Sequence, residues 1–284
     1  MGIGIGLTLA LGRGGVVPFN AAQAPGLVAD WDFTDATKLY TDSGTTLVSS
    51  NADVVGQIND KSGNGYHLRQ TDGTAKGTYR TGQVNGYPIV RLDGVNDYYQ
   101  CISAASTFNF LHRGNSSVYV VLKSALASGS VAYFIDNISL AGSIGSRYGY
   151  YWRPDYRTGS GFTQAIVNVL KGTSITLVAN SNSNLMSSSS FFLASSLCEP
   201  NNATAANKQT WRKNGGTAQN NNVATGTTDS TQSASYALCV GATGGDQGSP
   251  FPADLVSILI YNQLHGTTHR QYVENGLIRK FAIS

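Results

Sequence analysis

The feature of this sequence that most limits its fold is a long series of short apolar runs with the two-residue period of β-strands, separated by Gly, Asn and Asp. Runs of this kind, bounded by turn residues, are typical of strands, and many of them in one chain are typical of a sandwich or jelly roll. We predict strands at residues 26–33, 54–59, 66–70, 87–92, 98–102, 117–123, 131–135, 148–153, 165–170, 174–179, 191–197, 209–213, 235–241 and 254–261.

The composition agrees with an all-β chain. Only Glu199 and Glu274 among the 16 acidic residues are glutamates, whereas helix-rich proteins place many glutamates on exposed faces. Ser, Thr, Asn and Gly gather in blocks such as 187–190 and 220–222, which suit connections between strands. Because one sandwich can hold 284 residues, we expect a single large domain.

One helix is predicted at the end of the chain. It opens near Thr267 or Thr268 as the N-cap, and Val273, Leu277 and Phe281 then share one face. Gly276 inside this helix costs about 1 kcal/mol relative to Ala. We therefore expect tertiary packing to hold the helix at that point.

Charge and metal-ligand patterns exclude several classes of protein. The net charge is +3 and its positive residues are scattered singly, which argues against nucleic acid as a partner. The sequence contains no run of 18 consecutive apolar residues, so no membrane span is predicted. Cys101, Cys198 and Cys239 are expected to be buried thiols without disulfides. His265 and His269 lack a third zinc ligand and are expected at the surface.

The first residues form a glycine-rich segment with strict alternation. Such a strand is entropically poor and packs little on its small face, so it needs a partner surface. We predict that it is an assembly arm, docked on another subunit, followed by a linker, which divides the chain into an arm at 1–24 and a sandwich at 25–284. No Lys or Arg precedes the apolar stretch, so a cleaved secretory signal is not expected. The side chains that share the apolar face of the arm are Ile3, Ile5, Leu7, Leu9 and Leu11.

Four blocks then occur in a fixed order: GLVADWD at 26–32, NDKSGNG at 59–65, PIVRLDGVNDY at 88–98, and LVSILIYNQL at 255–264 followed by the short helix. Together they resemble the laminin-G-like or concanavalin A-like jelly rolls of bacterial and bacteriophage surface proteins. Asn59 stands where this family usually has Trp, and Ser257 where it often has Glu. The resemblance implies a two-sheet antiparallel jelly-roll sandwich but no particular activity, because this fold hosts lectins, glycosidases and structural modules.

The second block contains a candidate calcium loop. Asp60, Ser62 and Asn64 have the alternate spacing at which oxygen ligands converge on calcium. The twelfth position lacks the bidentate Glu of an EF-hand, so further ligands would have to come from elsewhere, such as Asp93 or Asp97. The alternative is an Asx-rich turn that satisfies only its own backbone. No other cofactor is expected.

A second candidate site is the most aromatic and most basic stretch of the chain. On a strand, alternate side chains of this stretch would point to opposite faces. Aromatic rings with Arg donors suit sugar stacking or a protein interface, while the plain alternative is one core face and one solvated face. The candidate binding residues are Tyr148, Tyr150, Tyr151, Trp152, Arg153, Tyr156 and Arg157.

Catalytic patterns are scarce. Glycoside hydrolysis needs two carboxyl groups, and only Asp30 and Asp32 have a spacing that places a pair on one face of a strand. Because both lie in the block that resembles an opening strand, we expect no enzymatic activity.

The leading hypothesis is a non-enzymatic bacteriophage virion protein, such as a capsid decoration, head fibre or tail-associated adhesion protein. Its N-terminal arm, which resembles the starts of such proteins, would bind other virion proteins, and the sandwich would be displayed on the particle as a homo-oligomer that contacts host-surface glycans. The alternative is a free or secreted carbohydrate-binding module. The third hypothesis is a polysaccharide-degrading enzyme that uses Asp30 and Asp32.

Overall fold

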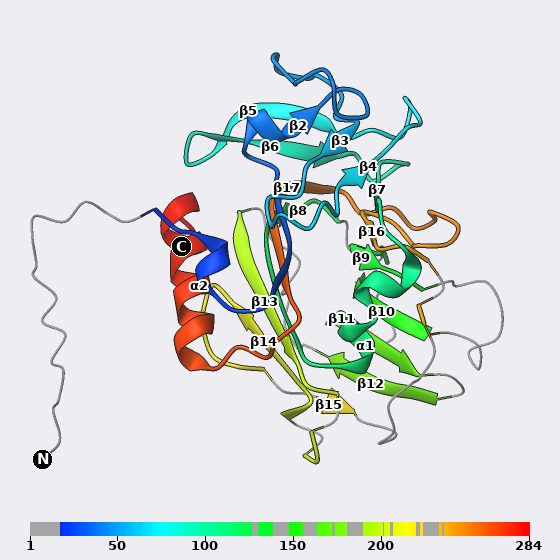
Figure 1. The fold of residues 1–284 in the computed structure, drawn as a ribbon, viewed down its shortest axis with the longest axis vertical. Helices are drawn as coiled ribbons and strands as arrows, with labels where there is room; N and C mark the ends of the chain where they lie inside the picture. The colour runs from blue at the N-terminus through cyan, green and yellow to red at the C-terminus, as the bar shows by residue number, and fades with distance from the viewer. Residues whose placement is uncertain are drawn as a thin grey trace, which may run out of the picture.

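The computed structural model describes residues 18–126, 130–138, 148–155, 164–171, 174–180, 190–200, 202–204, 207–219, 222–223, 233–234 and 236–284. Within these residues the strands form two antiparallel sheets, of seven and ten strands, with a helix near the end of the chain (Figure 1). The predicted all-β, two-sheet antiparallel sandwich with a short C-terminal helix is therefore confirmed.

The seven-stranded sheet is centred on β17, which pairs with β8 along one edge. Its other edge is shared by β6, opposite residues 253–255, and by β1, opposite residues 257–261. A register shift near Val256 separates the two pairings. The strand order is β14 (Gln209–Lys213), β13 (Phe192–Cys198), β8 (Ser116–Ser124), β17 (Ala253–Tyr261), β6 (Tyr87–Leu92) and β5 (Thr78–Val84), with β1 (Leu27–Asp32) also on β17.

The ten-stranded sheet is built from many shorter strands. Its order is β15 (Asn222–Val223), β12 (Ser174–Asn180), β11 (Gln164–Lys171), β10 (Tyr148–Asp155), β9 (Ile135–Asp136), β16 (Cys239–Val240), β7 (Tyr99–Cys101), β4 (Leu68–Arg69), β3 (Gln57–Ile58) and β2 (Leu39–Tyr40). Short helical turns lie in connections between the two sheets: η2 (Ala36–Lys38) between β1 and β2, and η3 (Ala105–Phe108) and α1 (Phe110–Arg113) between β7 and β8.

All fourteen predicted strand ranges overlap an observed strand, and those at 87–92 and 209–213 match β6 and β14 in full. Three observed strands, β2, β5 and β15, were not predicted. The longest of them, β5, has the sequence TYRTGQV and lies at the edge of its sheet with much of its length exposed. Only Tyr79 and Val84 of this strand are buried, and the exposed residues between them leave no regular apolar alternation to recognise.

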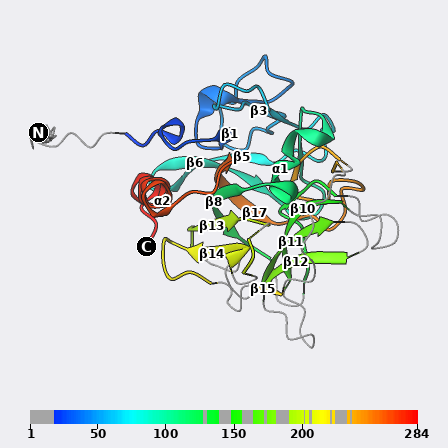
Figure 2. The ribbon, with the colours of Figure 1, turned by 60° about the horizontal axis from the view of Figure 1, so that its bottom comes forward.

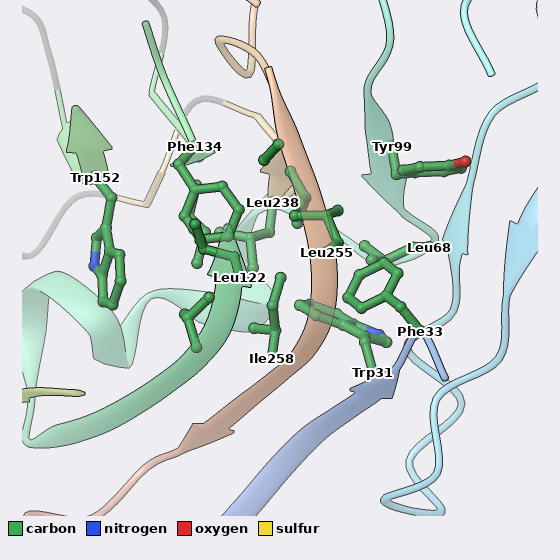
Figure 3. Close-up of a cluster of buried hydrophobic side chains, with 14 of the residues drawn as sticks. Trp31, Phe33, Leu68, Tyr99, Leu122, Phe134, Trp152, Leu238, Leu255 and Ile258 are labelled. Carbon is green, nitrogen blue, oxygen red and sulfur yellow. The ribbon is translucent and has the colours of Figure 1, made fainter. Parts of the chain in front are cut away.

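The main core lies between the two sheets, where strand alternation sorts the side chains. Along β8, Val118, Val120 and Leu122 point into this core, whereas Tyr119 and Val121 point to the outer face of the seven-stranded sheet. Figure 3 shows rings and aliphatic side chains from both sheets meeting in the main core. Cys101, Cys198 and Cys239 are buried and form no disulfide among the described residues, as predicted.

The helix α2 (Thr267–Phe281) covers the outer face of the seven-stranded sheet (Figure 1). Val273, Leu277 and Phe281 form part of a second core cluster there, which confirms the predicted apolar face. The predicted N-cap is wrong, because the helix begins at Thr267 and Gly266 occupies the cap position without a side-chain hydrogen bond. No helix in the described part of the chain is long and apolar enough to cross a membrane.

Residues 18–24, which we call the N-terminal strap, pack beside α2 and include the short helix η1 (Ala21–Gln23) (Figures 1 and 2). The Phe19 and Tyr272 ring centroids lie 5.6 Å apart, and the Tyr261 hydroxyl donates to Ala21 O over 3.0 Å. The end of the segment expected to be a linker is therefore part of the packed domain. Phe19 also covers Gly276, where a Cβ atom would overlap with its ring.

This contact predicts the effect of Gly276→Ala. Alanine is about 1 kcal/mol better than glycine inside a helix, yet overlap with Phe19 should make the variant less stable by about 1–3 kcal/mol. Urea unfolding of the variant and of the Asn275→Ala control, at an exposed position of the same helix, measures the difference. Adding Phe19→Ala should restore part of the loss. A Gly276→Ala variant as stable as the control would contradict the packing argument.

Candidate functional site

The predicted aromatic stretch lies on β10, and its alternate side chains point to opposite faces, as predicted. Tyr150 and Trp152 are fully buried in the main core, where Figure 3 shows the Trp152 ring. On the other face, Tyr151 packs edge-on against Tyr133 with ring centroids 5.4 Å apart, and the Arg153 guanidinium lies 5.8 Å from the Tyr151 ring centroid. The two core rings cannot stack on a ligand in this arrangement, so a binding role for the stretch stays a prediction.

Other predicted site residues lie outside the described residues. They are the Tyr148 side chain, Tyr156 and Arg157 of the aromatic stretch, and Ile3, Ile5, Leu7, Leu9 and Leu11 of the arm.

The candidate calcium loop is held together by its own hydrogen bonds. The two carboxylate oxygens of Asp60 accept from Asp30 N, Ser62 N, Ser62 Oγ and Tyr66 N at distances of 2.7–3.1 Å. The Asn64 amide donates to a carbonyl oxygen of β1 over 2.9 Å. These contacts are those of the Asx-rich turn. Among the described residues no three His, Cys, Asp or Glu side chains are grouped to hold a metal, and calcium at Asp60 stays a prediction.

A pocket of about 220 Å³ opens on the outer face of the seven-stranded sheet, between β1, the strap and the end of α2. Two carboxylates from β1 and two lysines from separate segments meet in it. Its apolar wall comes from the strap, β17 and α2. The residues that line it are Phe19, Asn20, Ala21, Asp30, Asp32, Lys61, Ser257, Leu259, Leu277 and Lys280.

Asp32 is the most heavily bonded group in the pocket. Its Oδ2 lies 3.0 Å from Lys61 Nζ and 2.9 Å from Lys280 Nζ, and its Oδ1 accepts from the Thr34 hydroxyl over 2.6 Å. Burial opposes its ionisation, but the two ammonium groups and the hydroxyl outweigh that effect and hold the pKa of Asp32 below its ordinary value. Asp32 is therefore a carboxylate that ties β1 to the loop after β3 and to α2.

Asp30 lies two residues earlier on the same face of β1, and its environment has the opposite effect. Among the described residues no donor is hydrogen-bonded to its carboxyl group. Burial, followed by the charge of Asp32, raises the pKa of Asp30 to about 6, although Lys61 and Lys280 oppose this. The pocket thus contains one carboxylate that is fully paired and one carboxyl group that is free to accept from a ligand.

Sequence reasoning recognised the spacing of Asp30 and Asp32 but missed the pocket. Lys61 and Lys280 carry no local pattern, because they reach Asp32 from a loop and from a helix far apart in the chain. The available signal was the alternation itself. In Asp-Trp-Asp, Trp31 enters the main core, so both carboxylates must point to the opposite face of the sheet.

The structure also corrects the expectation for one histidine. His269 is exposed, but His265 is only 3% exposed. Its Nε2 donates to Pro25 O over 3.0 Å, and its Nδ1 accepts from the Tyr119 hydroxyl over 2.9 Å. Burial lowers the pKa of His265 in spite of the Pro25 carbonyl. The ring is therefore a structural contact between β8 and Pro25, the residue that follows the strap.

No protein-family model and no curated protein matches this sequence. Solved structures with a similar fold include an arabinofuranosidase complexed with arabinofuranosyl-alpha-1,2-xylobiose, at 14% identity and a TM-score of 0.58, over 90% of this chain and 63% of that one. Trypanosoma rangeli sialidase in complex with the inhibitor DANA is similar at 10% identity and a TM-score of 0.52, over 91% of this chain and 34% of that one. A botulinum neurotoxin type C structure is described by the dependence of cell entry on two ganglioside molecules. It is similar at 9% identity and a TM-score of 0.51, over 89% of this chain and 51% of that one.

This chain spans less than two thirds of the length of each of these proteins. At such identities the similarity shows the fold alone, a two-sheet antiparallel β-sandwich. The predicted jelly-roll architecture is confirmed at this level, while the narrower laminin-G-like family stays a prediction.

The expectation that the chain is not an enzyme is corrected by the same comparisons, because an arabinofuranosidase and a sialidase are among the similar structures. The expectation dismissed Asp30 and Asp32 because they belong to an opening strand. Membership of that strand is no obstacle to chemistry, since both carboxyl groups line a pocket.

The raised pKa of Asp30 predicts a pH-dependent difference in stability. A folded pKa of about 6 against an ordinary value of 3.8 means that the folded state holds the proton more tightly than the unfolded state. The ionised group therefore destabilises the fold above about pH 6, and this penalty fades as the pH falls towards about 4. Asp30→Asn should be more stable than the original chain at about pH 8, by on the order of 2 kcal/mol, and lose that advantage in acid.

Urea unfolding at several pH values measures this difference. Asp72→Asn is the control of opposite sign, because hydrogen bonds from Thr74 lower the pKa of Asp72 on an exposed turn. A difference in stability between Asp30→Asn and the original chain that is the same in acid and in alkali would refute the raised pKa of Asp30.

Proposed function

We propose that this chain is a carbohydrate-binding β-sandwich domain whose sugar site is the pocket at Asp30 and Asp32. The observation that carries the proposal is the Asp30 carboxyl group, which lines the pocket and has no hydrogen-bond donor among the described residues. Sugar hydroxyls are hydrogen-bond donors, and this partly exposed carboxyl group offers them acceptor oxygens.

The remaining walls suit a small polar ligand with an apolar side. Leu259 and Leu277 supply an apolar surface, and Ser257 and the lysines supply further polar groups around it. The volume of about 220 Å³ is below the range of roughly 300–1,000 Å³ that drug-sized ligands occupy. The pocket therefore suits one sugar unit, such as the end or a branch of a glycan.

The fold supports the same proposal by analogy. The similar structures include two proteins complexed with a saccharide or a sialidase inhibitor and one described by its dependence on gangliosides. The analogy concerns the scaffold, whereas the residues that would bind sugar in this chain are its own.

Titration calorimetry of the full chain against a panel of mono- and disaccharides tests the proposal. Asp30→Ala removes the acceptor and should weaken binding by at least about tenfold, the equivalent of about 1.4 kcal/mol. Asp72→Ala, on an exposed turn that is not part of the pocket lining, is the matched control and should bind as the original chain does. Sugar binding that Asp30→Ala leaves intact would place the site elsewhere.

A second candidate function, glycoside hydrolysis, is favoured by the opposite pKa shifts of Asp30 and Asp32. Two neighbouring carboxyl groups whose environments separate their pKa values are the pattern of an acid paired with an ionised partner. Protonated Asp30 would donate to the leaving glycosidic oxygen. Asp32, already bonded to Lys61 and Lys280, would stabilise the positively charged sugar ring of the transition state through its negative charge. A water molecule would then bond to the anomeric carbon and give a proton to Asp30, which returns Asp30 to its protonated form.

Release of reducing ends from polysaccharides or of nitrophenol from aryl glycosides measures this activity. Asp30→Asn should lower kcat by about 10²–10⁴-fold, because it removes the acid. In the original chain kcat should fall as the pH rises above about 6, where Asp30 ionises. Turnover that survives Asp30→Asn would remove the acid role from this residue.

The narrower proposal, a bacteriophage-like virion protein attached by residues 1–24, concerns where such a domain is carried. Its support is the apolar alternation of the arm and the need of a glycine-rich strand for a partner surface. Deletion of residues 2–12 should leave the sandwich folded and abolish self-association or incorporation into a particle. Light scattering that finds the same oligomeric state with and without these residues would contradict the assembly role.

A further inference from the structure

We infer that the Asp30 pocket selects uncharged sugars and rejects sugar acids, with the Asp30 carboxylate as the discriminating group. This inference rests on the proposed sugar site and adds the chemical class of its ligand. It follows from the way in which the charges around the pocket are already paired.

Both ammonium groups of the pocket are engaged with carboxylates. Lys61 Nζ lies 3.0 Å from Asp32 Oδ2 and 3.0 Å from Asp35 Oδ2. Lys280 Nζ lies 2.9 Å from the same Asp32 oxygen. A ligand carboxylate that approached either lysine would therefore share an ammonium group whose positive charge is already offset by Asp32, and it would gain less than at an unpaired lysine.

The local charge balance is therefore negative. Asp30, Asp32 and Asp35 supply three carboxylates against the two lysines, and Asp60, whose oxygens accept hydrogen bonds from its own loop, adds a further negative charge close to Asp30. The strap contributes Phe19, Asn20 and Ala21 to the pocket and no charge. A second carboxylate brought by a ligand would meet the unpaired Asp30 at short range.

A neutral sugar avoids this repulsion. Its hydroxyl groups donate to the oxygens of Asp30, and the C–H groups on one face of its ring pack on Leu259 and Leu277. Like charges held close together in a partly buried site are strongly unfavourable. The same site therefore favours a neutral sugar over a sugar acid of nearly identical shape.

Acidification should weaken the discrimination, because protonated Asp30 no longer repels an anion. The charged and titratable groups that act on Asp30 or face it are Asp32, Asp60, Lys61, Lys280 and Tyr261. Lys280, Lys61 and the Thr34 hydroxyl outweigh burial and lower the pKa of Asp32, and burial raises the pKa of Tyr261. Burial raises the pKa of Asp30 to about 6, so Asp30 changes charge between about pH 5 and 7.5. Sugar acids, like other α-substituted carboxyl groups, stay ionised over that range.

The test is calorimetric titration of the full chain with matched pairs, galactose against galacturonic acid and glucose against glucuronic acid, at about pH 7.5 and about pH 5. For whichever pair binds, we expect the neutral sugar to bind at least about tenfold more tightly at the higher pH, with a smaller ratio at the lower pH. Asp30→Asn keeps an acceptor oxygen and removes the charge. It should bring the ratio close to one by strengthening the binding of the acid.

Lys280→Gln is a second variant with the opposite effect. It removes a positive charge from the pocket wall and should increase the ratio, which provides a readout even if Asp30→Asn folds poorly. Sugar acids that bind the original chain as tightly as their neutral partners would overturn the inference while leaving the sugar site in place. A ratio of neutral-sugar to sugar-acid affinity that Asp30→Asn does not change would have the same meaning. Absence of binding by neutral and acidic sugars alike would overturn the proposed function and the inference with it.

Discussion

The burial of β17 on both faces is the constraint on which the rest of the structure depends. Every residue of this strand is buried. Leu255, Ile258 and Ile260 enter the main core, whereas Val256 and Leu259 point to the outer face. An outer face of this kind cannot be left in water, so the sandwich needs a third layer. The helix α2 and the strap supply it, and the pocket lies in the space that these two covers leave over β1 and β17.

The same layer explains why charged residues are found at a place that is otherwise apolar. Asp32 points outward from β1 under this cover, and its desolvation is offset by lysines from two other segments. The ion pairs thereby fasten α2 and the loop after β3 to the opening strand. Asp30, on the same face, receives no such partner among the described residues. The two neighbouring carboxyl groups of the pocket therefore differ in their ion-pair partners and have pKa values shifted in opposite directions.

The sequence predicted those parts of the fold that local alternation determines. The strands β8 and β17 were found because each has apolar side chains facing two cores, and α2 because its apolar residues recur at helical spacing. The edge strand β5 was missed because only Tyr79 and Val84 are buried, and they are too far apart to give an apolar alternation. Gly276 was recognised as needing a packing partner, but Phe19 could not be identified, since the contact joins distant parts of the chain. The pocket was missed for the same reason: alternation places Asp30 and Asp32 on one face, while Lys61 and Lys280 arrive through tertiary structure alone.

The docking of the strap on α2 also has a geometrical consequence. Phe19 and Lys280 line the same pocket, so the beginning of the packed domain and the end of its last helix are neighbours in space. Whatever is joined to the chain before the strap is therefore tethered on the helix side of the molecule. The ten-stranded sheet lies on the other side of the sandwich (Figure 1). The described part of the chain therefore begins and ends on the same side of the sandwich, away from the ten-stranded sheet.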